Sequence, residues 1–381
     1  MRKVAVLFGG ESCENEISVL TGVFVLKVLE GSGFDPVPVY IHTDGKTYSS
    51  PKMKDLNVFR EKNREGFRQV LFDGDGLYEV NFAKRKLKRL AKIDVALNCC
   101  HGGLGEGGGV SAMMAWHKIP FASPDLTASG VFMDKSMSKL VMRALGVPTL
   151  DYIRVNERDY EKRGAFLLRS VEGRLKYPVV IKPAHLGSSI GIAVARNEAE
   201  AKAAIETAFT LDTRLIIEKY LAEKRDVNCA AYALNGEIFV SEPETAFGDG
   251  IYSFEEKYVK RTSDGISKSA PRRNQKPESG DRYALSGELR EKIRSYTKTV
   301  YKRMNLQGVV RMDFLVSEGK VYLCEVNTVP GSLAYYLFCE RIIDARQFFV
   351  ALLEDAIERS KKEKKIIVST GILQGVQWRR K

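Results

Sequence analysis

The sequence predicts an α/β protein of two or three domains, α+β when the whole chain is considered, and three observations support this prediction. The length of 381 residues is enough for more than one domain at roughly 100 to 200 residues each. Apolar strand-like runs at residues 3–8 and 94–99 are each followed by a glycine-rich stretch and a helical pattern. Two alternating strands also surround Ser317-Glu318-Gly319, which is typical of an antiparallel hairpin.

Composition places the chain among soluble globular proteins. Hydrophobic residues make up 44% and charged residues 28%, and no apolar run approaches the roughly 20 residues that a membrane helix needs. The opening MRKVAVLFGG contains an apolar stretch too short for a signal peptide. The six cysteines lack the spacing of a zinc site or of a secreted disulfide scaffold. We therefore expect a cytoplasmic protein with reduced thiols and no membrane partner.

The formal net charge of +12 raises the alternative of a nucleic-acid surface. The basic residues are spread over many segments, including residues 84–92, 257–276 and 361–365. A nucleic-acid-binding module would concentrate them in a recognisable motif with interleaved aromatic residues, and no such motif is visible in the sequence. We therefore expect most of these charges to be solvated and no nucleic-acid partner.

The N-terminal domain is expected at residues 1–124. The strand at residues 3–8 leads through a glycine pair into a helix with apolar residues at helical spacing. The strand at 94–99 leads through HGGLGEGGG into a helix at 110–116. Two such units predict an open parallel sheet with ligand-binding loops at the strand ends.

A small central α+β subdomain is expected at residues 125–222. Its pattern predicts a helix at 134–145, a strand at 179–182 that runs into a Gly-Ser loop, a helix at 198–209 and a strand at 215–218. The change of pattern after the N-terminal domain indicates a separate folding unit.

A C-terminal subdomain with an antiparallel sheet is expected at residues 223–360. Asn235-Gly236 between two alternating runs predicts a hairpin. Residues 247–282 are rich in glycine, serine and charged residues without periodicity, and we expect a long loop that acts as a lid. The basic tail at residues 361–381 receives no functional role.

The segment VVRMDFLVSEGKVYLCEVNTVPGS carries the strongest chemical signal. We expect a hairpin with a three-residue loop, and the period of two places Arg311, Asp313, Glu325 and Asn327 on one face. Two carboxylates, an amide and a guanidinium suit the binding of Mg²⁺ with a triphosphate. The alternative is a ladder of surface salt bridges, which is common on paired strands.

A second segment, YPVVIKPAHLGSSIG, is suited to phosphate. Its strand carries Lys182 to a loop whose backbone N–H groups and the hydroxyls of Ser188 and Ser189 can bind an anion. Lys135, at the start of a helix, adds a second positive charge. The alternative is a simple turn. The chain lacks the standard P-loop pattern, which argues against a P-loop nucleotide fold.

These segments together resemble the ATP-grasp enzymes, and within them the D-alanine:D-alanine ligase family. The resemblance covers nearly the whole chain and rests on ordered motifs: VAVLFGGESCENEIS, NCCHGGLGEGG, MDKSMSK, VVIKPAHLGSSIG, LIIEKYL, EEKYV, RMDFLV and EVNTVPGS. It implies an ATP-grasp fold with an N-terminal α/β domain, a central domain and a C-terminal domain. ATP would be held between the last two.

The resemblance also implies an ATP site. Lys135 and Lys182 match contacts to the phosphates of ATP. Glu218 and Asp226 match contacts to the adenosine and the ribose. Lys257 lies at the start of the loop that the family uses as a lid over ATP.

Metal-binding and oxyanion-stabilising residues follow from the same comparison. Asp313, Glu325 and Asn327 match the family's magnesium ligands, which implies two Mg²⁺ ions with Mn²⁺ as an alternative. Arg311 and the backbone N–H of Gly331 match the pair that stabilises the oxyanion. The hairpin pattern and the resemblance therefore select the same four side chains.

The first-substrate pocket is implied by four residues. Glu14 matches the acidic residue that receives the substrate ammonium, and in the family this residue is linked to Ser188 and to a tyrosine matched by Tyr258. A carboxylate at a helix N-terminus is also favoured by the helix dipole, so Glu14 has a structural explanation as well. His101 matches a histidine that lines this pocket, and a purely structural histidine is the alternative.

The implied reaction transfers the γ-phosphoryl group of ATP to a carboxylate, and an amine then attacks the acyl phosphate to form an amide. Two departures from the family concern specificity. Gly107 stands where an aspartate usually follows Glu106, and Tyr336 stands where many members have a serine that binds the carboxylate of the second substrate. Tyr336 is the corresponding candidate here, because its hydroxyl can donate a hydrogen bond. The Lys257-Tyr258 pair resembles peptide-forming rather than ester-forming members.

Three functions are therefore carried forward. The first is a ligase that makes D-alanyl-D-alanine for peptidoglycan precursors. The second is a ligase of the same chemistry that joins a different pair of small amino acids, and the third is a catalytically silent ATP-binding relative. A homodimer is implied by the resemblance alone.

Overall fold

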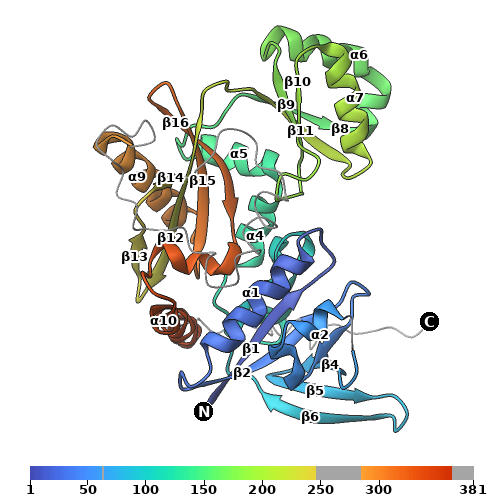
Figure 1. Cartoon of the computed structure of the whole chain (residues 1–381), viewed down its shortest axis with the longest axis vertical. Coiled ribbons are helices and arrows are strands. Elements are labelled where there is room, and N and C mark those ends of the chain that lie inside the picture. Colours follow the sequence, from blue (N-terminus) through green and yellow to red (C-terminus); the bar gives the residue numbers. More distant parts are fainter. Residues whose placement is uncertain (62–63, 246–284, 363–381) are drawn as a thin grey trace, which may run out of the picture.

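The computed structural model describes residues 1–61, 64–245 and 285–362 (Figure 1). These residues form three sheets that use separate stretches of the chain: residues 2–98, 152–219 and 225–327. The mixed architecture of a parallel-strand region followed by two antiparallel sheets confirms the predicted fold class. None of the helices in the described part of the chain has the length and apolar composition needed to cross a membrane.

Some predictions lie outside the described residues. They are the lid at 247–282, its residues Lys257 and Tyr258, and the basic tail beyond residue 362.

The N-terminal sheet has the strand order β6-β5-β4-β3-β2-β1-β7. Its centre is β1 (Arg2–Gly9), which pairs in parallel with β2 (Phe34–Ile41) and with β7 (Val95–Asn98). Successive β1 side chains enter two different buried clusters, one on each face of the sheet. The predicted open parallel sheet is confirmed for these three strands.

The rest of this sheet is an antiparallel extension that the sequence analysis did not predict. It contains β3 (Thr47–Ser49), β4 (Arg68–Asp73), β5 (Gly76–Asn81) and β6 (Lys86–Lys92). In β6, with the sequence KLKRLAK, only Ala91 is buried. The apolar alternation of a strand is therefore hidden, and the lysines protect an exposed sheet edge from pairing with another chain.

Helices cover both faces of the parallel strands. One face is covered by α1 (Asn15–Val28) and the other by α3 (Val110–Trp116). Both follow glycine-containing loops, as predicted. The remaining short elements are η1 (Pro51–Lys54), α2 (Asn57–Arg60) and the π-helical turn η2 (Gly105–Gly109).

The central sheet is antiparallel and has the order β10-β9-β11-β8. Its core contains only residues between 153 and 217, and Figure 1 shows it as a separate lobe in green at the upper right. Two long helices complete the lobe. The bounds are β8 (Tyr152–Asn156), α6 (Glu157–Arg174), β9 (Val179–Pro183), β10 (Ala193–Ala195), α7 (Glu198–Phe209) and β11 (Arg214–Lys219).

The third sheet is also antiparallel, with the order β13-β12-β15-β16 and β14 paired to β12. Helix α9 packs on one face, while the other face borders the cavity described below. The bounds are β12 (Arg225–Leu234), β13 (Glu237–Val240), β14 (Glu244–Thr245), α9 (Gly287–Arg303), β15 (Val310–Ser317), β16 (Lys320–Asn327), η5 (Gly331–Leu337) and α10 (Ile342–Lys361). The hairpin predicted at Asn235-Gly236 is confirmed as the turn between β12 and β13.

The predicted three-residue loop between β15 and β16 is wrong. Ser317 pairs with Lys320, so only Glu318 and Gly319 form the turn, with φ of 50° and 70°. Two consecutive residues with positive φ give the turn type that matches the twist of paired strands. The tighter turn shifts the register by one residue.

A β-bulge at Cys324 compensates for this shift. With the two-residue turn, uninterrupted pairing would set Glu325 opposite Met312, whose side chain is buried in the core. Cys324 is the extra residue, and beyond it Asp313 pairs with Glu325. The four polar residues predicted on one face of the hairpin therefore do share a face, although the register behind that prediction was incorrect.

The linking helices α4 (Leu126–Met133) and α5 (Lys135–Ala144) pack on the third sheet. Phe132 and Met142 belong to the same buried cluster as the core side of β15 and β16. Residues 125–222 were assigned to the central subdomain, in which α5 was predicted as a helix and α4 was not. The boundaries near residues 124 and 222 stay predictions, but the helices share their core with the C-terminal sheet.

The position of α1 depends on close packing at Gly22. A Cβ atom added there would lie 2.3 Å from the Phe8 side chain of β1, and overpacking of this kind typically costs about 1 to 3 kcal/mol. We expect Gly22→Ala to lower the free energy of unfolding by that amount in urea denaturation. Gly173→Ala in α6 is the matched control, because a Cβ there meets nothing within 4 Å. If Gly22→Ala were as stable as this control, the close packing would have no energetic role.

Candidate active site

A cavity of about 660 Å³ lies where the three sheets approach one another. Its lining comes from α1, the loops that follow β7 and β9, the end of β11, and the strands β12, β15 and β16. All the predicted site residues in the described part of the chain line it. They are Glu14, His101, Lys135, Lys182, Ser188, Glu218, Asp226, Arg311, Asp313, Glu325, Asn327, Gly331 and Tyr336.

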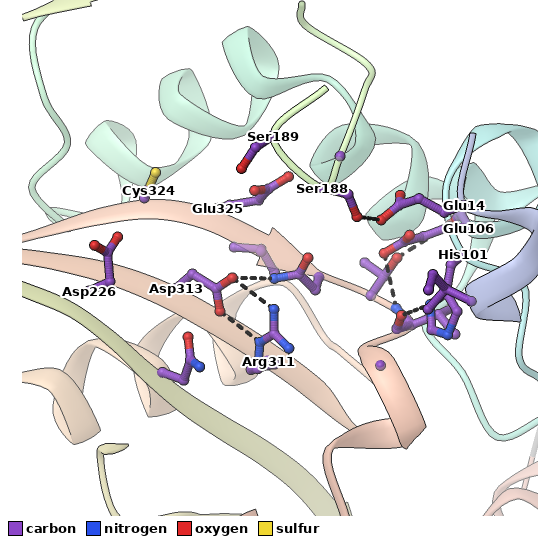
Figure 2. A pocket seen from close by; sticks show the side chains of 18 of the residues that line it. Glu14, His101, Glu106, Ser188, Ser189, Asp226, Arg311, Asp313, Cys324 and Glu325 are labelled. Atoms are coloured by element: carbon purple, nitrogen blue, oxygen red, sulfur yellow. Dashed lines mark hydrogen bonds and ion pairs between the residues drawn. The ribbon is translucent and has the colours of Figure 1, made fainter. Parts of the chain in front are cut away.

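The open face of the β15–β16 hairpin forms the floor of the cavity (Figure 2). Arg311 holds both carboxylate oxygens of Asp313, with Nε donating to Oδ1 at 2.8 Å and Nη2 donating to Oδ2 at 2.9 Å. The amide nitrogen of Asn327 donates to Asp313 Oδ2 at 3.1 Å. Glu325 stands beside Asp313 as its cross-strand partner. The predicted convergence of these four side chains is confirmed.

The donor set of this face fits a magnesium ion. Asp313 and Glu325 offer carboxylate oxygens, and Asn327 uses its amide nitrogen on Asp313, which leaves its carbonyl oxygen as the donor to a cation. The described residues contain no cluster of three or more His, Cys, Asp or Glu that could hold a metal alone. Mg²⁺ typically takes one or two protein carboxylates and completes its shell with phosphate and water, so this set suits a metal that arrives with a nucleotide.

Lys135 connects three parts of the site. Its Nζ lies 3.1 Å from Glu325 Oε1 and donates to the carbonyl of Leu186 in the loop after β9 at 2.6 Å. Asp134 caps the N-terminus of α5 by accepting from the backbone N–H groups of residues 136 and 137, which fixes the first turn. Lys135 therefore stands in the cavity wall, between the metal-binding face and the glycine-serine loop.

Glu218 is buried between two lysines. Its carboxylate pairs with Lys139 at 2.5 Å and with Lys182, and only 1% of its side chain is exposed. Burial opposes ionisation, but the two positive charges prevail and lower the pKa of Glu218 to about 2. Burial likewise opposes the charge on Lys182, and Cys324 and Glu218 outweigh it to raise the Lys182 pKa. Three buried charges with a net positive sign therefore lie at this end of the cavity.

Both carboxylate oxygens of Glu218 therefore lie on lysines. Lys139 was not predicted as a site residue. It lies one helical turn after Lys135 in MDKSMSK, and this i, i+4 spacing was the available signal.

Glu14 and Ser188 meet across the cavity. Ser188 Oγ donates to Glu14 Oε1, which joins the start of α1 to the glycine-serine loop (Figure 2). The approach is close, because a Cβ at Gly187 would lie 2.6 Å from Glu14 Oε2. Ser188 and Ser189 both have positive φ, at 51° and 63°. Strained backbone of this kind often marks a functional loop.

His101 is buried, and both ring nitrogens have partners in the protein. Nδ1 lies 2.7 Å from the carbonyl oxygen of Val329 and Nε2 lies 2.8 Å from Thr21 Oγ1. A hydrogen bond from His101 to a substrate would need one of these bonds to break. The structure therefore places His101 in the pocket wall, in agreement with the expected location, but engages its ring with the Val329 carbonyl and the Thr21 hydroxyl.

Asp226 and Tyr336 lie toward opposite ends of the floor. Asp226 accepts from Lys224 Nζ at 2.5 Å. Tyr336 Oη accepts from Arg311 Nη1 at 3.3 Å, so the tyrosine lies beside the guanidinium that holds Asp313. Glu106 and Asn228 also line the cavity and were not predicted as site residues. Asn228 is the cross-strand neighbour of Asp313, and the strand pairing needed to see this was not available from the sequence.

Comparison with known proteins agrees with this geometry. Residues 3–124 match the family model described as D-ala D-ala ligase N-terminus, and residues 141–358 match the one described as D-ala D-ala ligase C-terminus. The chain belongs to the D-alanine:D-alanine ligase family. It is therefore an enzyme of the ATP-dependent ligase class.

Individual relatives cover nearly the full chain. The D-alanine–D-alanine ligase of Caldicellulosiruptor bescii is 31% identical over 373 residues, which is 96% of this chain and 97% of that protein. The enzyme of the same name from Thermosipho africanus is 29% identical over 97% of both chains. Among solved structures, the D-alanine-D-alanine ligase from Helicobacter pylori superposes with a TM-score of 0.73 at 25% identity, covering 94% of this chain and 98% of that one.

The glycine-serine loop of this ligase-family chain is anchored by His185. Its Nδ1 lies 2.9 Å from Asp212 Oδ2 and its Nε2 lies 3.4 Å from Asp134 Oδ2. Arg214 Nη1 also donates to Asp134 at 2.7 Å. The hydrogen bonds to Asp134 and Asp212 raise the pKa of His185 to about 9. A protonated His185 thus ties the loop to the α5 cap and to the turn before β11.

This anchor predicts a pH-dependent stability difference. The folded-state pKa of about 9 exceeds the ordinary histidine pKa of 6.5, so the contribution of His185 is complete below about pH 6.5 and is lost as the pH rises through 9. We expect the wild type to have a higher Tm than His185→Gln at pH 6, and the gap to close by about pH 9.5. His117→Gln is the control, since the described residues offer His117 no carboxylate partner. A constant gap across this range would contradict the ion-paired state of His185.

Proposed function

We propose that the protein is a D-alanine:D-alanine ligase that supplies D-alanyl-D-alanine for peptidoglycan precursors. The observation that carries this proposal is the convergence of three groups on one cavity. They are the carboxylate-guanidinium floor of the β15–β16 hairpin, the lysines at its nucleotide end, and the Glu14–Ser188 contact at the other. The relatives from Thermosipho africanus and Caldicellulosiruptor bescii are D-alanine–D-alanine ligases, which supports the choice of substrate.

The first step transfers the γ-phosphoryl group of ATP to the carboxylate of the first D-alanine. Glu14 receives the ammonium of that D-alanine and fixes its orientation, while Ser188 holds Glu14 in place. Lys135 and Lys182 offset negative charge on the phosphates. Mg²⁺ held by Asp313, Glu325 and Asn327 would neutralise charge on the transferring group when bound.

The second step joins the amine of the second D-alanine to the acyl phosphate. The amine attacks the carbonyl carbon, a C–N bond forms, and the C–O bond to phosphate breaks with its electron pair passing to the phosphate. The tetrahedral intermediate carries an oxyanion, which Arg311 and the backbone N–H of Gly331 would stabilise. Tyr258 is proposed to complete the Glu14–Ser188 contact, and Lys257 to contact ATP.

Several finer features rest on the sequence and on its resemblance to the family. We propose two Mg²⁺ ions, replaceable by Mn²⁺, contacts of Asp226 with ribose and of Glu218 with adenosine, a cytoplasmic location and a homodimer.

A second candidate function concerns the acceptor. Tyr336 is bulkier than serine and already contacts Arg311, so the acceptor could be a different small amino acid. The VanG D-Ala:D-Ser ligase from Enterococcus faecalis shares the fold, with a TM-score of 0.71 at 23% identity over 94% of this chain and 99% of that one. A fold of this type therefore does not determine the acceptor.

The deciding experiment measures ADP release by the purified chain with ATP and Mg²⁺, and identifies the product by mass spectrometry. D-alanine is compared with L-alanine, D-serine and D-lactate. D-alanyl-D-alanine as the main product supports the proposal. A different dipeptide would reassign the acceptor, and ATP binding without turnover of any pair would indicate a silent relative.

Glu325→Gln tests the metal-binding face. The substitution keeps the size and one oxygen donor but removes the charge that holds Mg²⁺ and pairs with Lys135. Since a metal ion contributes several kcal/mol to such a step, we expect kcat to fall about 100-fold or more with the fold intact by circular dichroism. Raising Mg²⁺ should restore part of the activity. Wild-type kinetics in the variant would remove Glu325 from the metal site.

Tyr336→Phe tests the acceptor subsite. Loss of the hydroxyl removes a donor to the acceptor carboxylate, and a hydrogen bond to a charged group contributes about 1.5 to 3 kcal/mol, or roughly 10-fold or more in binding. We expect the KM of the second D-alanine to rise by about that factor while the KM of ATP stays unchanged. Equal KM values for the acceptor in both proteins would show that Tyr336 does not touch it.

A further inference from the structure

The backbone that carries Gly331 is held in a strained conformation. Residues 328–332, here called the oxyanion loop, connect β16 to η5. Directly after Gly331, three non-glycine residues in succession have positive φ: Ser332 at 50°, Leu333 at 53° and Ala334 at 47°. A left-handed conformation is unfavourable for an L-residue, because its Cβ comes too close to the following carbonyl oxygen. Three in a row persist only where surrounding contacts enforce them.

The enforcing contacts come from the N-terminal domain. The backbone N–H of Ser332 donates to Thr21 Oγ1 at 3.2 Å. Thr21 Oγ1 lies 2.8 Å from His101 Nε2, and His101 Nδ1 lies 2.7 Å from the carbonyl oxygen of Val329. Thr21 belongs to α1 and His101 follows β7. The side chains of Thr21 and His101 therefore hydrogen-bond to the oxyanion loop on both sides of Gly331.

The direction of each hydrogen bond follows from the chemistry. Burial lowers the pKa of His101 to about 4, so the ring is neutral and carries one N–H. A carbonyl oxygen can only accept, so this proton is on Nδ1 and points at Val329. Nε2 then accepts the Thr21 hydroxyl proton, which leaves the Thr21 oxygen to accept from Ser332. Each donor in this series of hydrogen bonds therefore meets one acceptor.

Glu106 also forms hydrogen bonds with this loop. Its Oε1 accepts from the backbone N–H of Val329 at 3.2 Å, and its Oε2 accepts from Gly102 N–H at 2.8 Å. Its backbone carbonyl accepts from Thr328 Oγ1 at 3.3 Å. Both backbone polar groups of Val329 are thus fixed by the N-terminal domain, two residues before Gly331.

We propose that Thr21, His101 and Glu106 form a positioning clamp that aims the Gly331 N–H at the oxyanion of the second step. This inference rests on the proposed function. The three residues act through the backbone and need not touch the substrate. Without the clamp, the strained turn relaxes and the Gly331 N–H swings away from the reacting carbonyl.

The clamp acts on amide formation rather than on phosphoryl transfer. The groups assigned to the first step lie on α5, β9, β15 and β16, in the loop after β9 and at the start of α1, and none of them is a member of the clamp. A disturbed clamp therefore leaves acyl-phosphate formation in place and slows attack by the second amine. A residue that merely supported the fold would slow both steps together.

Thr21→Val is the sharpest variant, because it keeps the shape and removes only the hydroxyl. Removing a whole oxyanion donor costs about 100-fold to 1000-fold, so displacing one should lower the kcat of ligation by at least about 10-fold. First-step chemistry is followed separately, by positional isotope exchange in ATP labelled with ¹⁸O in the β–γ bridge, at D-alanine concentrations that fill only the first-substrate site. Exchange should stay within about 3-fold of wild type, because the acyl phosphate still forms.

Two further variants complete the design. Thr21→Ser keeps the hydroxyl and should restore ligation to within about 3-fold of wild type, since the hydrogen-bond chain is intact. Thr297→Val is the matched control, because Thr297 is equally buried but lies in α9, outside the cavity lining. It should ligate like the wild type.

The results separate the clamp from the proposed function. Ligation in Thr21→Val at the wild-type rate, or an equal loss of ligation and isotope exchange, would overturn the clamp. A wild-type protein that makes no D-alanyl-D-alanine would refute the proposed function before any variant is compared. Selective loss of ligation with retained exchange and rescue by serine is the result expected.

Discussion

The chemistry of the cleft depends on one extra residue in one strand. Cys324 forms a bulge in β16, and beyond it Glu325 and Asn327 turn toward the cavity while Val326 stays in the core. Without the bulge, the two-residue turn would direct the carboxylate of Glu325 into an apolar core, where an ion is very costly. A bulge of this kind re-aims side chains at little cost to the rest of the sheet. The carboxylate face of the hairpin is therefore a product of backbone irregularity as much as of residue choice.

Much of the fold could be predicted from local sequence. The strand, glycine loop and helix at each ligand-binding edge were correctly located, and α3 and α7 begin and end where the periodicity indicated. The candidate site residues could be selected from the sequence because their motifs are short and ordered along the chain. The antiparallel extension around β6 was missed, since its outward lysines hide the alternation by which strands are recognised.

The interactions that hold the site together could not be predicted from the sequence, for a different reason. Thr21 and Val329 are joined through His101 although more than 300 residues separate them in sequence. Lys139 reaches Glu218 inside a buried cluster, yet its helix gives no sign of which carboxylate it meets. Such pairs depend on how separate elements dock, and no local pattern encodes docking. The predicted register of the β15–β16 hairpin was also wrong. The turn is one residue shorter than predicted and the bulge adds one residue, so the two differences cancel and each side chain keeps its predicted face.

The sharing of cores has a mechanical consequence. One buried cluster contains residues of the N-terminal sheet, such as Phe8, together with residues of η5 and α10, such as Tyr335 and Phe349. The central sheet keeps a core of its own. The first and last parts of the chain therefore share one core, and the central sheet forms a separately packed lobe. If the cleft widens to admit a nucleotide, the central lobe is the part that moves. It would carry Lys182 and Ser188 away from the β15–β16 hairpin, which stays in place.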